Sequence, residues 1–236
     1  MREYIFQPIF ITLILEVCVY NIQSCFIAEK AGAARIEFCS DPLQGGVTSS
    51  YGAIQYAIEH ISIPIFPMIR PRGGNFIYDA DELAIMKKDM LQCRSLGCPG
   101  IATGVQLPDG SIDTEQLKRI VEWAFPMAVT CHKVFDTTPD AFQALEDVIA
   151  TGCSRILTSG LCKDAVAGAS IITQLVTQAA GRIIIMPGGG VRSANIAQLV
   201  KDTGAMEYHS SALIAKANNP IADEQEVKLL VKGLIG

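Results

Sequence analysis

The segment TGCSRILT, residues 151–158, has a pattern that returns along the chain and predicts a repeated structural unit. A glycine able to end a helix is followed within a few residues by a short apolar run typical of a buried strand. We predict left-handed backbone at each of these glycines, where the missing Cβ removes the steric clash. The related segments are AGAARIEF (31–38), LGCPGIATG (96–104), AAGRIIIM (179–186) and TGAMEYHS (203–210), with glycines Gly32, Gly97, Gly152, Gly181 and Gly204.

These segments belong to an alternation of predicted strands and helices that runs along the whole chain. The expected strands are residues 13–19, 35–39, 64–70, 100–105, 127–132, 155–159, 182–186 and 205–209. The expected helices are residues 22–30, 52–60, 81–96, 113–124, 138–150, 165–180, 193–201 and 224–234. From Cys18 to Tyr208 the chain advances 190 residues over seven repeats, about 27 residues each, which suits one strand, one helix and two short loops.

Eight such units without a linker predict a single (β/α)8 TIM barrel over residues 1–236, because about 250 residues is typical of that fold. A doubly wound open sheet is the competing α/β fold. It usually needs only five or six strands, and it gives the first and eighth strands no reason to be neighbours.

Composition excludes several classes of protein. Half of the 236 residues are hydrophobic and 18% are charged, which excludes a disordered or fibrous chain. A net charge of -5 argues against nucleic acid or a membrane surface as the main partner. Eight cysteines are too few for a disulfide scaffold, so we expect reduced thiols and a cytoplasmic location. The apolar run at residues 9–19 is interpreted as a strand because it contains Glu16, lacks a cleavage site and is shorter than the ~20 residues of a membrane span.

Polar residues in the strands show which side faces the barrel interior, since alternate residues face the helices and must be apolar. Closure makes the eighth, first and second strands consecutive, so Glu207, Glu16 and Glu37 are expected to form an acidic arc inside. Two interpretations stay open: an interior network of ion pairs, or a functional pocket at the carboxyl ends of the strands. The pocket candidates are Glu16, Glu37, Arg70, His132, Glu207 and His209.

An anion site is a further candidate at the ends of strands seven and eight, where barrels often bind phosphate through backbone amides. A glycine turn can also serve a tight left-handed bend. Arg70 and Arg72, which follow strand three, suit an anion, but either could instead pair with the acidic arc. The candidate anion-binding residues are Arg72, Gly188, Gly189, Gly190, Ser210 and Ser211.

Cys18 and Cys39 differ from the other cysteines because both are expected to face the interior. Each follows a glutamate by two residues, and their strands should lie ~4.8 Å apart. Two soft thiolates at that spacing suit Cu(I). The alternative is that both cysteines simply fill space in the core.

Motifs in order along the chain carry a family resemblance. They are LEVCV (15–19), IEFC (36–39), GGVT (45–48), MIRPRGGNFIY (68–78), DGSID (109–113), HKVFD (132–136), RILTSG (155–160), MPGGGV (186–191) and EYHSSA (207–212). Together they resemble the CutC family, which is named for copper homeostasis. Departures from the family pattern are Ser49, Asn75 and Lys133, where proline, aspartate and arginine are usual.

The resemblance implies a cytoplasmic (β/α)8 barrel that commonly forms a homodimer or a higher homo-oligomer and is linked to copper tolerance. In some members Cu(I) is bound through the cysteines that match Cys18 and Cys39. The first hypothesis is therefore a copper homeostasis protein that binds Cu(I), with Glu16, Glu37 or His209 around the thiolates.

The alternative hypothesis is a TIM-barrel enzyme that acts on a small anionic or phosphorylated metabolite at the C-terminal face of the barrel. In that hypothesis the loops after strands seven and eight anchor the anion, Arg70 stabilises developing charge, and His132 or Glu207 transfers protons. A third possibility is a barrel without catalysis that acts through oligomeric contacts.

Overall fold

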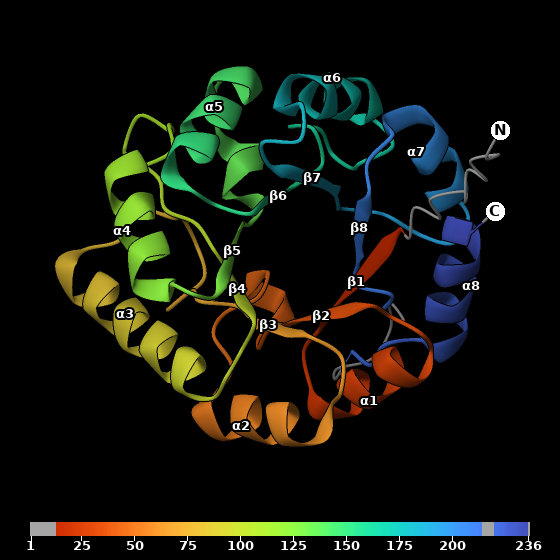
Figure 1. Cartoon of the computed structure of the whole chain (residues 1–236), viewed down its shortest axis with the longest axis horizontal. Helices are drawn as coiled ribbons and strands as arrows, with labels where there is room; N and C mark the ends of the chain where they lie inside the picture. The colour runs from red at the N-terminus through yellow and green to blue at the C-terminus, as the bar shows by residue number, and fades with distance from the viewer. Residues whose placement is uncertain (1–12, 214–219, 236) are drawn as a thin grey trace, which may run out of the picture.

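The computed structural model describes residues 13–213 and 220–235, so residues 9–12 of the predicted first strand and both ends of the predicted 1–236 domain lie outside it. Short parallel strands form a central ring (Figure 1). The strands are β1 (Ile14–Val19), β2 (Arg35–Phe38), β3 (Ile65–Pro67), β4 (Gly100–Thr103), β5 (Ala128–Cys131), β6 (Arg155–Thr158), β7 (Ile184–Pro187) and β8 (Glu207–Ser210). Each lies within one residue of, or inside, the strand predicted for it.

The ring closes because the first strand pairs with the last. β1 and β8 are parallel neighbours from Ile14 opposite Glu207 to Val17 opposite Ser210. The ladders run in the orders β3-β2-β1-β8 and β4-β5-β6-β7, and β3 lies beside β4 and β7 beside β8. The predicted (β/α)8 barrel is confirmed, and the open sheet, which offers no such pairing, is excluded.

Helices surround the ring (Figure 1). They are α1 (Ile22–Lys30), α2 (Tyr51–His60), α3 (Ala80–Ser95), α4 (Thr114–Ala124), α5 (Ala141–Thr151), α6 (Ala169–Ala179), α7 (Ile196–Thr203) and α8 (Glu224–Ile235). α5 begins later than predicted because the Asp140 carboxylate accepts hydrogen bonds from the backbone N–H groups of Phe142 and Gln143 and so fixes the start. Two short 3-10 helices, η1 (Pro42–Gln44) and η2 (Lys133–Thr137), follow β2 and β5. None of the helices in the described ranges is long and apolar enough to cross a membrane.

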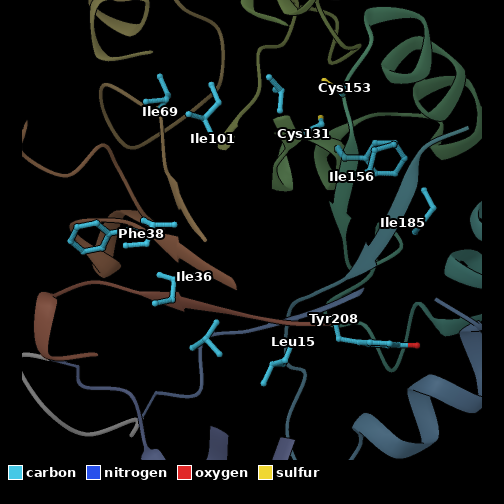
Figure 2. Close-up of a cluster of buried hydrophobic side chains, with 14 of the residues drawn as sticks. Leu15, Ile36, Phe38, Ile69, Ile101, Cys131, Cys153, Ile156, Ile185 and Tyr208 are labelled. Atoms are coloured by element: carbon cyan, nitrogen blue, oxygen red, sulfur yellow. The ribbon is translucent and has the colours of Figure 1, made fainter. Parts of the chain in front are cut away.

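The main core lies between the strands and the helices. Figure 2 shows this buried cluster, including Leu15, Ile36, Ile156 and Tyr208. Residues at alternate strand positions turn inward, where Cys18, Cys39, Met68 and Ala102 form a separate small cluster. The predicted inward and outward faces of β1 and β2 are therefore confirmed.

Ion pairs fill the barrel below this inner cluster. Arg35 donates from Nε to Glu16 Oε2 at 2.5 Å and from Nη2 to Glu207, and Arg155 Nε donates to Glu207 at 3.1 Å. All four side chains are buried, and both guanidinium groups lie over the Phe66 ring at 5.1 Å. The first interpretation of the acidic arc, an interior network of ion pairs, thus holds for Glu16 and Glu207. The cations are Arg35 and Arg155, however, rather than Arg70.

Removing one charge from this network should destabilise the protein strongly. In Glu207→Gln, Arg35 and Arg155 lose the carboxylate that they share, and breaking a buried pair costs roughly 3–5 kcal/mol because a buried charge is left uncompensated. Urea unfolding at pH 7 measures the loss. The control is Glu146→Gln, which breaks an exposed pair with Arg182 and should change stability little. Equal losses in the two variants would contradict this account.

Candidate functional site

A cavity of about 110 Å³ lies within the barrel and includes side chains from the carboxyl ends of the strands. Four of the six pocket candidates line it, namely Glu37, Arg70, His132 and His209. Glu16 and Glu207 do not, because they are engaged in the ion pairs beneath it. The other lining residues are Cys18, Tyr20, Gly45, Met68, Phe76, Lys133 and Leu157.

Two thiols meet beside this cavity. Cys18 Sγ lies 3.8 Å from Cys39 Sγ, and both residues are buried. That separation is far longer than the 2.05 Å of a disulfide, so both cysteines are free. The hydrogen bond from Cys39 holds the pKa of Cys18 well below its usual range; burial opposes this shift and the neighbouring His209 assists it. Ionisation is thus favoured at Cys18, whereas the bond with Cys18 and burial raise the pKa of Cys39 well above its usual range.

The loop after β2 closes over Cys39 and requires a glycine there. Gly46 has a φ of 94°, and a Cβ at this position would lie 3.2 Å from Cys39 Sγ. Arg70 holds the same loop, since Nη1 donates to the carbonyl oxygens of Gln44 at 2.7 Å and Gly46 at 3.0 Å. Its Nη2 donates to Gly74 O at 2.8 Å. Arg70 therefore joins two loops above the thiols and makes no ion pair with the acidic arc.

His209 connects the thiols to the ion pairs below. Its Nδ1 is hydrogen bonded to Glu16 Oε1 at 2.7 Å, and its Nε2 lies 3.8 Å from Glu37 Oε2. Burial opposes ionisation of Glu16, but its bonds with His209 and Arg35 outweigh that cost and lower its pKa to about 2. Burial likewise opposes protonation of His209, yet Glu37, Cys18 and Glu16 raise its pKa well above the usual range. His209 is thus an imidazolium.

Glu37 completes the group around the thiols. Burial raises its pKa well above the usual range, and the Cys18 thiolate adds to that effect. Its Oε2 lies 3.6 Å from Cys39 Sγ. The potential ligand atoms of Cys18, Glu37 and Cys39 all lie within 4.8 Å of one another, as do those of Glu16, Glu37 and His209. These are the groupings in the described residues that suit a metal ion.

His132 lies on another wall of the cavity as a neutral imidazole. Its Nδ1 accepts a hydrogen bond from the Val134 N–H at 3.2 Å, so the ring proton is on Nε2. Burial, followed by the charge of Arg70, lowers its pKa to about 3. The ring packs against Phe76 with centroids 4.8 Å apart. Room for the ring depends on Gly104, where a Cβ would lie 2.7 Å from Nδ1.

Several of the residues predicted to bind an anion make other contacts in the structure. Arg72 donates to Glu82 Oε1 at 2.5 Å and to backbone carbonyls of its own loop. Ser210 Oγ donates to Val191 O at 2.7 Å, and Ser211 is half-buried. Gly188 is needed for packing, because a Cβ there would lie 2.3 Å from the Leu157 side chain. Gly189 and Gly190 have φ values of 90° and 73°, which is the left-handed bend weighed as the alternative.

Sequence reasoning missed some residues of this region. Arg35 and Arg155 each open a strand, and Arg35 shares the inward phase of Glu37 two residues later, so that alternation was an available signal. Tyr20 continues the same phase two residues after Cys18. Phe76, in contrast, reaches the cavity from a loop that has no periodic pattern, and nothing in the sequence indicates its position.

The neutral state of His132 predicts a specific dependence of stability on pH. The unfolded chain binds a proton at this residue near pH 6.5, whereas the folded chain binds it only near pH 3, so stability is lost as pH falls below 6.5. From pH 7 to pH 5, the free energy of unfolding should fall by about 2 kcal/mol more in the wild type than in His132→Gln. Urea titrations of both proteins at each pH measure this difference, and parallel curves would contradict it.

Comparison with known proteins places this chain in a family. The model of the CutC family matches residues 13–214. A CutC family protein of Parabacteroides distasonis is 48% identical over 200 residues, covering 84% of this chain and 82% of the relative. A mouse protein named copper homeostasis protein cutC homolog is 42% identical over 199 residues, covering 84% of this chain and 73% of the relative.

Solved structures agree with these matches. The crystal structure of a CutC protein from Streptococcus agalactiae superposes with a TM-score of 0.80 at 32% identity, covering 85% of this chain and 99% of that one. Phosphoribosylanthranilate isomerase of Thermotoga maritima, at 12% identity and a TM-score of 0.63, shares the barrel fold alone. On the family match and these relatives, the chain belongs to the CutC family, a family of copper homeostasis proteins.

Proposed function

We propose that this protein binds Cu(I) through the thiolates of Cys18 and Cys39 and serves copper homeostasis in the cytoplasm. The observation that carries the proposal is the 3.8 Å separation of two buried, reduced sulfur atoms inside the barrel. Soft thiolates select Cu(I), and an interior site shields the bound ion from water. The copper homeostasis name of the mouse relative supports the same function.

The surroundings of the two sulfur atoms suit ligation. The His209 imidazolium and the Cys39 thiol both favour the thiolate of Cys18, so this ligand is ready before the metal arrives. Binding through both sulfurs also requires Cys39 to lose its proton. Glu37 Oε2, at 3.6 Å from Cys39 Sγ, is placed to accept it.

The two cysteines lie at different depths from the cavity. Cys18 lines the cavity, whereas Cys39 lies behind it under the Gly46 backbone, so an ion that enters through the cavity meets Cys18 first. All eight cysteines are free, as expected in a reducing compartment.

Self-association as a homodimer or a higher homo-oligomer stays a prediction.

The alternative of an enzyme acting on a small anionic metabolite has less support. Glu207, one of the two groups expected to move protons, is held by two arginines, and Arg72 is engaged by Glu82. His132, the other of these two groups, lines the cavity.

Titration of Cu(I) against the reduced protein, with a chromophoric chelator as competitor, tests the proposal. The Cys18→Ser, Cys39→Ser double variant should bind Cu(I) more than about 100-fold more weakly. Loss of both ligands should cost more than the roughly 10–100-fold that is typical for loss of a residue that only hydrogen bonds to a ligand. The matched control is the Cys93→Ser, Cys98→Ser variant, which removes a second pair of neighbouring buried thiols outside the barrel interior. It should bind as the wild type does. Equal affinities of the wild type and the first double variant would exclude the proposal.

A further inference from the structure

Three buried polar atoms on the cavity walls have no hydrogen-bond partner among the described residues. They are Glu37 Oε1, Arg70 Nε and His132 Nε2. These three residues are 3%, 6% and 3% exposed, respectively. Buried polar atoms are nearly always paired with protein, ordered water or a ligand, so three in one cavity mark it as a place where a polar molecule binds.

Two of these atoms are hydrogen-bond donors. His132 Nε2 carries the ring proton because Nδ1 accepts from the Val134 N–H. Arg70 Nε carries a hydrogen at all times, and the other two nitrogens of its guanidinium are engaged by backbone carbonyls. Both donor side chains pack against Phe76, whose ring centre lies 4.8 Å from Arg70 Cζ and 4.8 Å from the centre of the His132 ring.

Copper at the thiols would not satisfy these donors. N–H groups cannot ligate a cation, and Arg70 is positively charged. They require an acceptor atom, and the cations Arg70 and Lys133, which both line the cavity, favour an acceptor that is negatively charged. Glu37 Oε1, on the same cavity, is suited to accept a hydrogen bond from another part of the molecule.

The volume and the walls limit the size of that molecule. A cavity needs roughly 10–15 Å³ to hold one water, so about 110 Å³ has room for a compact ligand of several atoms. Met68, Leu157 and Phe76 supply apolar contacts for a short carbon skeleton. A phosphate dianion would bring more negative charge next to Glu37 than a carboxylate does.

We propose that this cavity is a binding site for a small hydroxy- or amino-carboxylate. Its carboxylate accepts hydrogen bonds from Arg70 Nε and His132 Nε2 with Lys133 nearby, and its hydroxyl or amino group donates to Glu37 Oε1. The site adjoins the thiol pair but does not depend on copper, so it goes beyond the proposed function.

The experiment uses copper-free, reduced protein in which histidine is labelled with ¹⁵N. The chain has three histidines, so the Nε2–H signal of His132 can be assigned with variants at this position. Glycolate, lactate, glycine and alanine are the probes, and inorganic phosphate is the comparison anion. At least one carboxylate should shift the His132 Nε2–H signal and raise the melting temperature, with a saturable dependence on concentration.

Two substitutions of His132 separate ligand binding from folding. Asparagine can still accept from the Val134 N–H but has no atom at the position of Nε2, whereas glutamine places an amide N–H near it. Binding should weaken by roughly 10–100-fold in His132→Asn, as expected for a lost hydrogen bond to a charged group, and by less in His132→Gln. Lys133→Gln, at a half-exposed site, should weaken binding by a smaller factor.

The proposal is overturned if no carboxylate shifts the signal, which would mean that water alone fills the cavity. It is also overturned if phosphate binds more tightly than every carboxylate, or if His132→Asn binds as well as the wild type. The Cys18→Ser, Cys39→Ser variant should keep carboxylate binding. Failure of copper binding and failure of this proposal are therefore distinguishable.

Discussion

The bonds of Arg35 to Glu16 and Glu207 are the interaction on which the interior of this barrel depends. A carboxylate inside a barrel is costly unless it is paired, and Arg35 pairs two of them at once across neighbouring strands. The second oxygen of Glu16 then holds His209, which lies beside Cys18 and Glu37. The ion pairs at the base therefore orient the imidazolium that favours the thiolate above it.

Two kinds of polar group meet in the cavity above these pairs. On the side of β1 and β2 lie sulfur and carboxyl groups. The sulfur atoms suit a soft cation, and the carboxyl group can accept the proton that a thiol loses when the cation binds. Arg70 and His132, which follow β3 and β5, supply N–H donors that suit an acceptor oxygen. Arg70 serves both parts, because its Nη atoms hold the loop over Cys39 while its Nε has no hydrogen-bond partner in the part of the chain that the structure describes. A single cavity is thus lined by one thiol of the pair, Cys18, and by N–H donors on another wall.

Much of this arrangement is predictable from the sequence because it follows from strand periodicity. Glu16 with Cys18 and Glu37 with Cys39 fix the inward phase of two adjacent strands, and closure of eight units brings β8 and its Glu207 and His209 beside them. The choice of partner is not predictable in this way. Arg72 pairs with Glu82 because α3 packs beside the loop after β3, and that contact depends on tertiary packing. The same holds for Arg70, whose partners are backbone carbonyls that have no sequence signature.

X-ray absorption at the copper edge of the Cu(I)-loaded protein tests directly whether Cys18 and Cys39 ligate the ion. We expect a first coordination shell that contains two sulfur atoms, and we expect that shell to disappear in the Cys18→Ser, Cys39→Ser variant. A first shell of nitrogen and oxygen alone, or a sulfur shell that is unchanged in the variant, would contradict it.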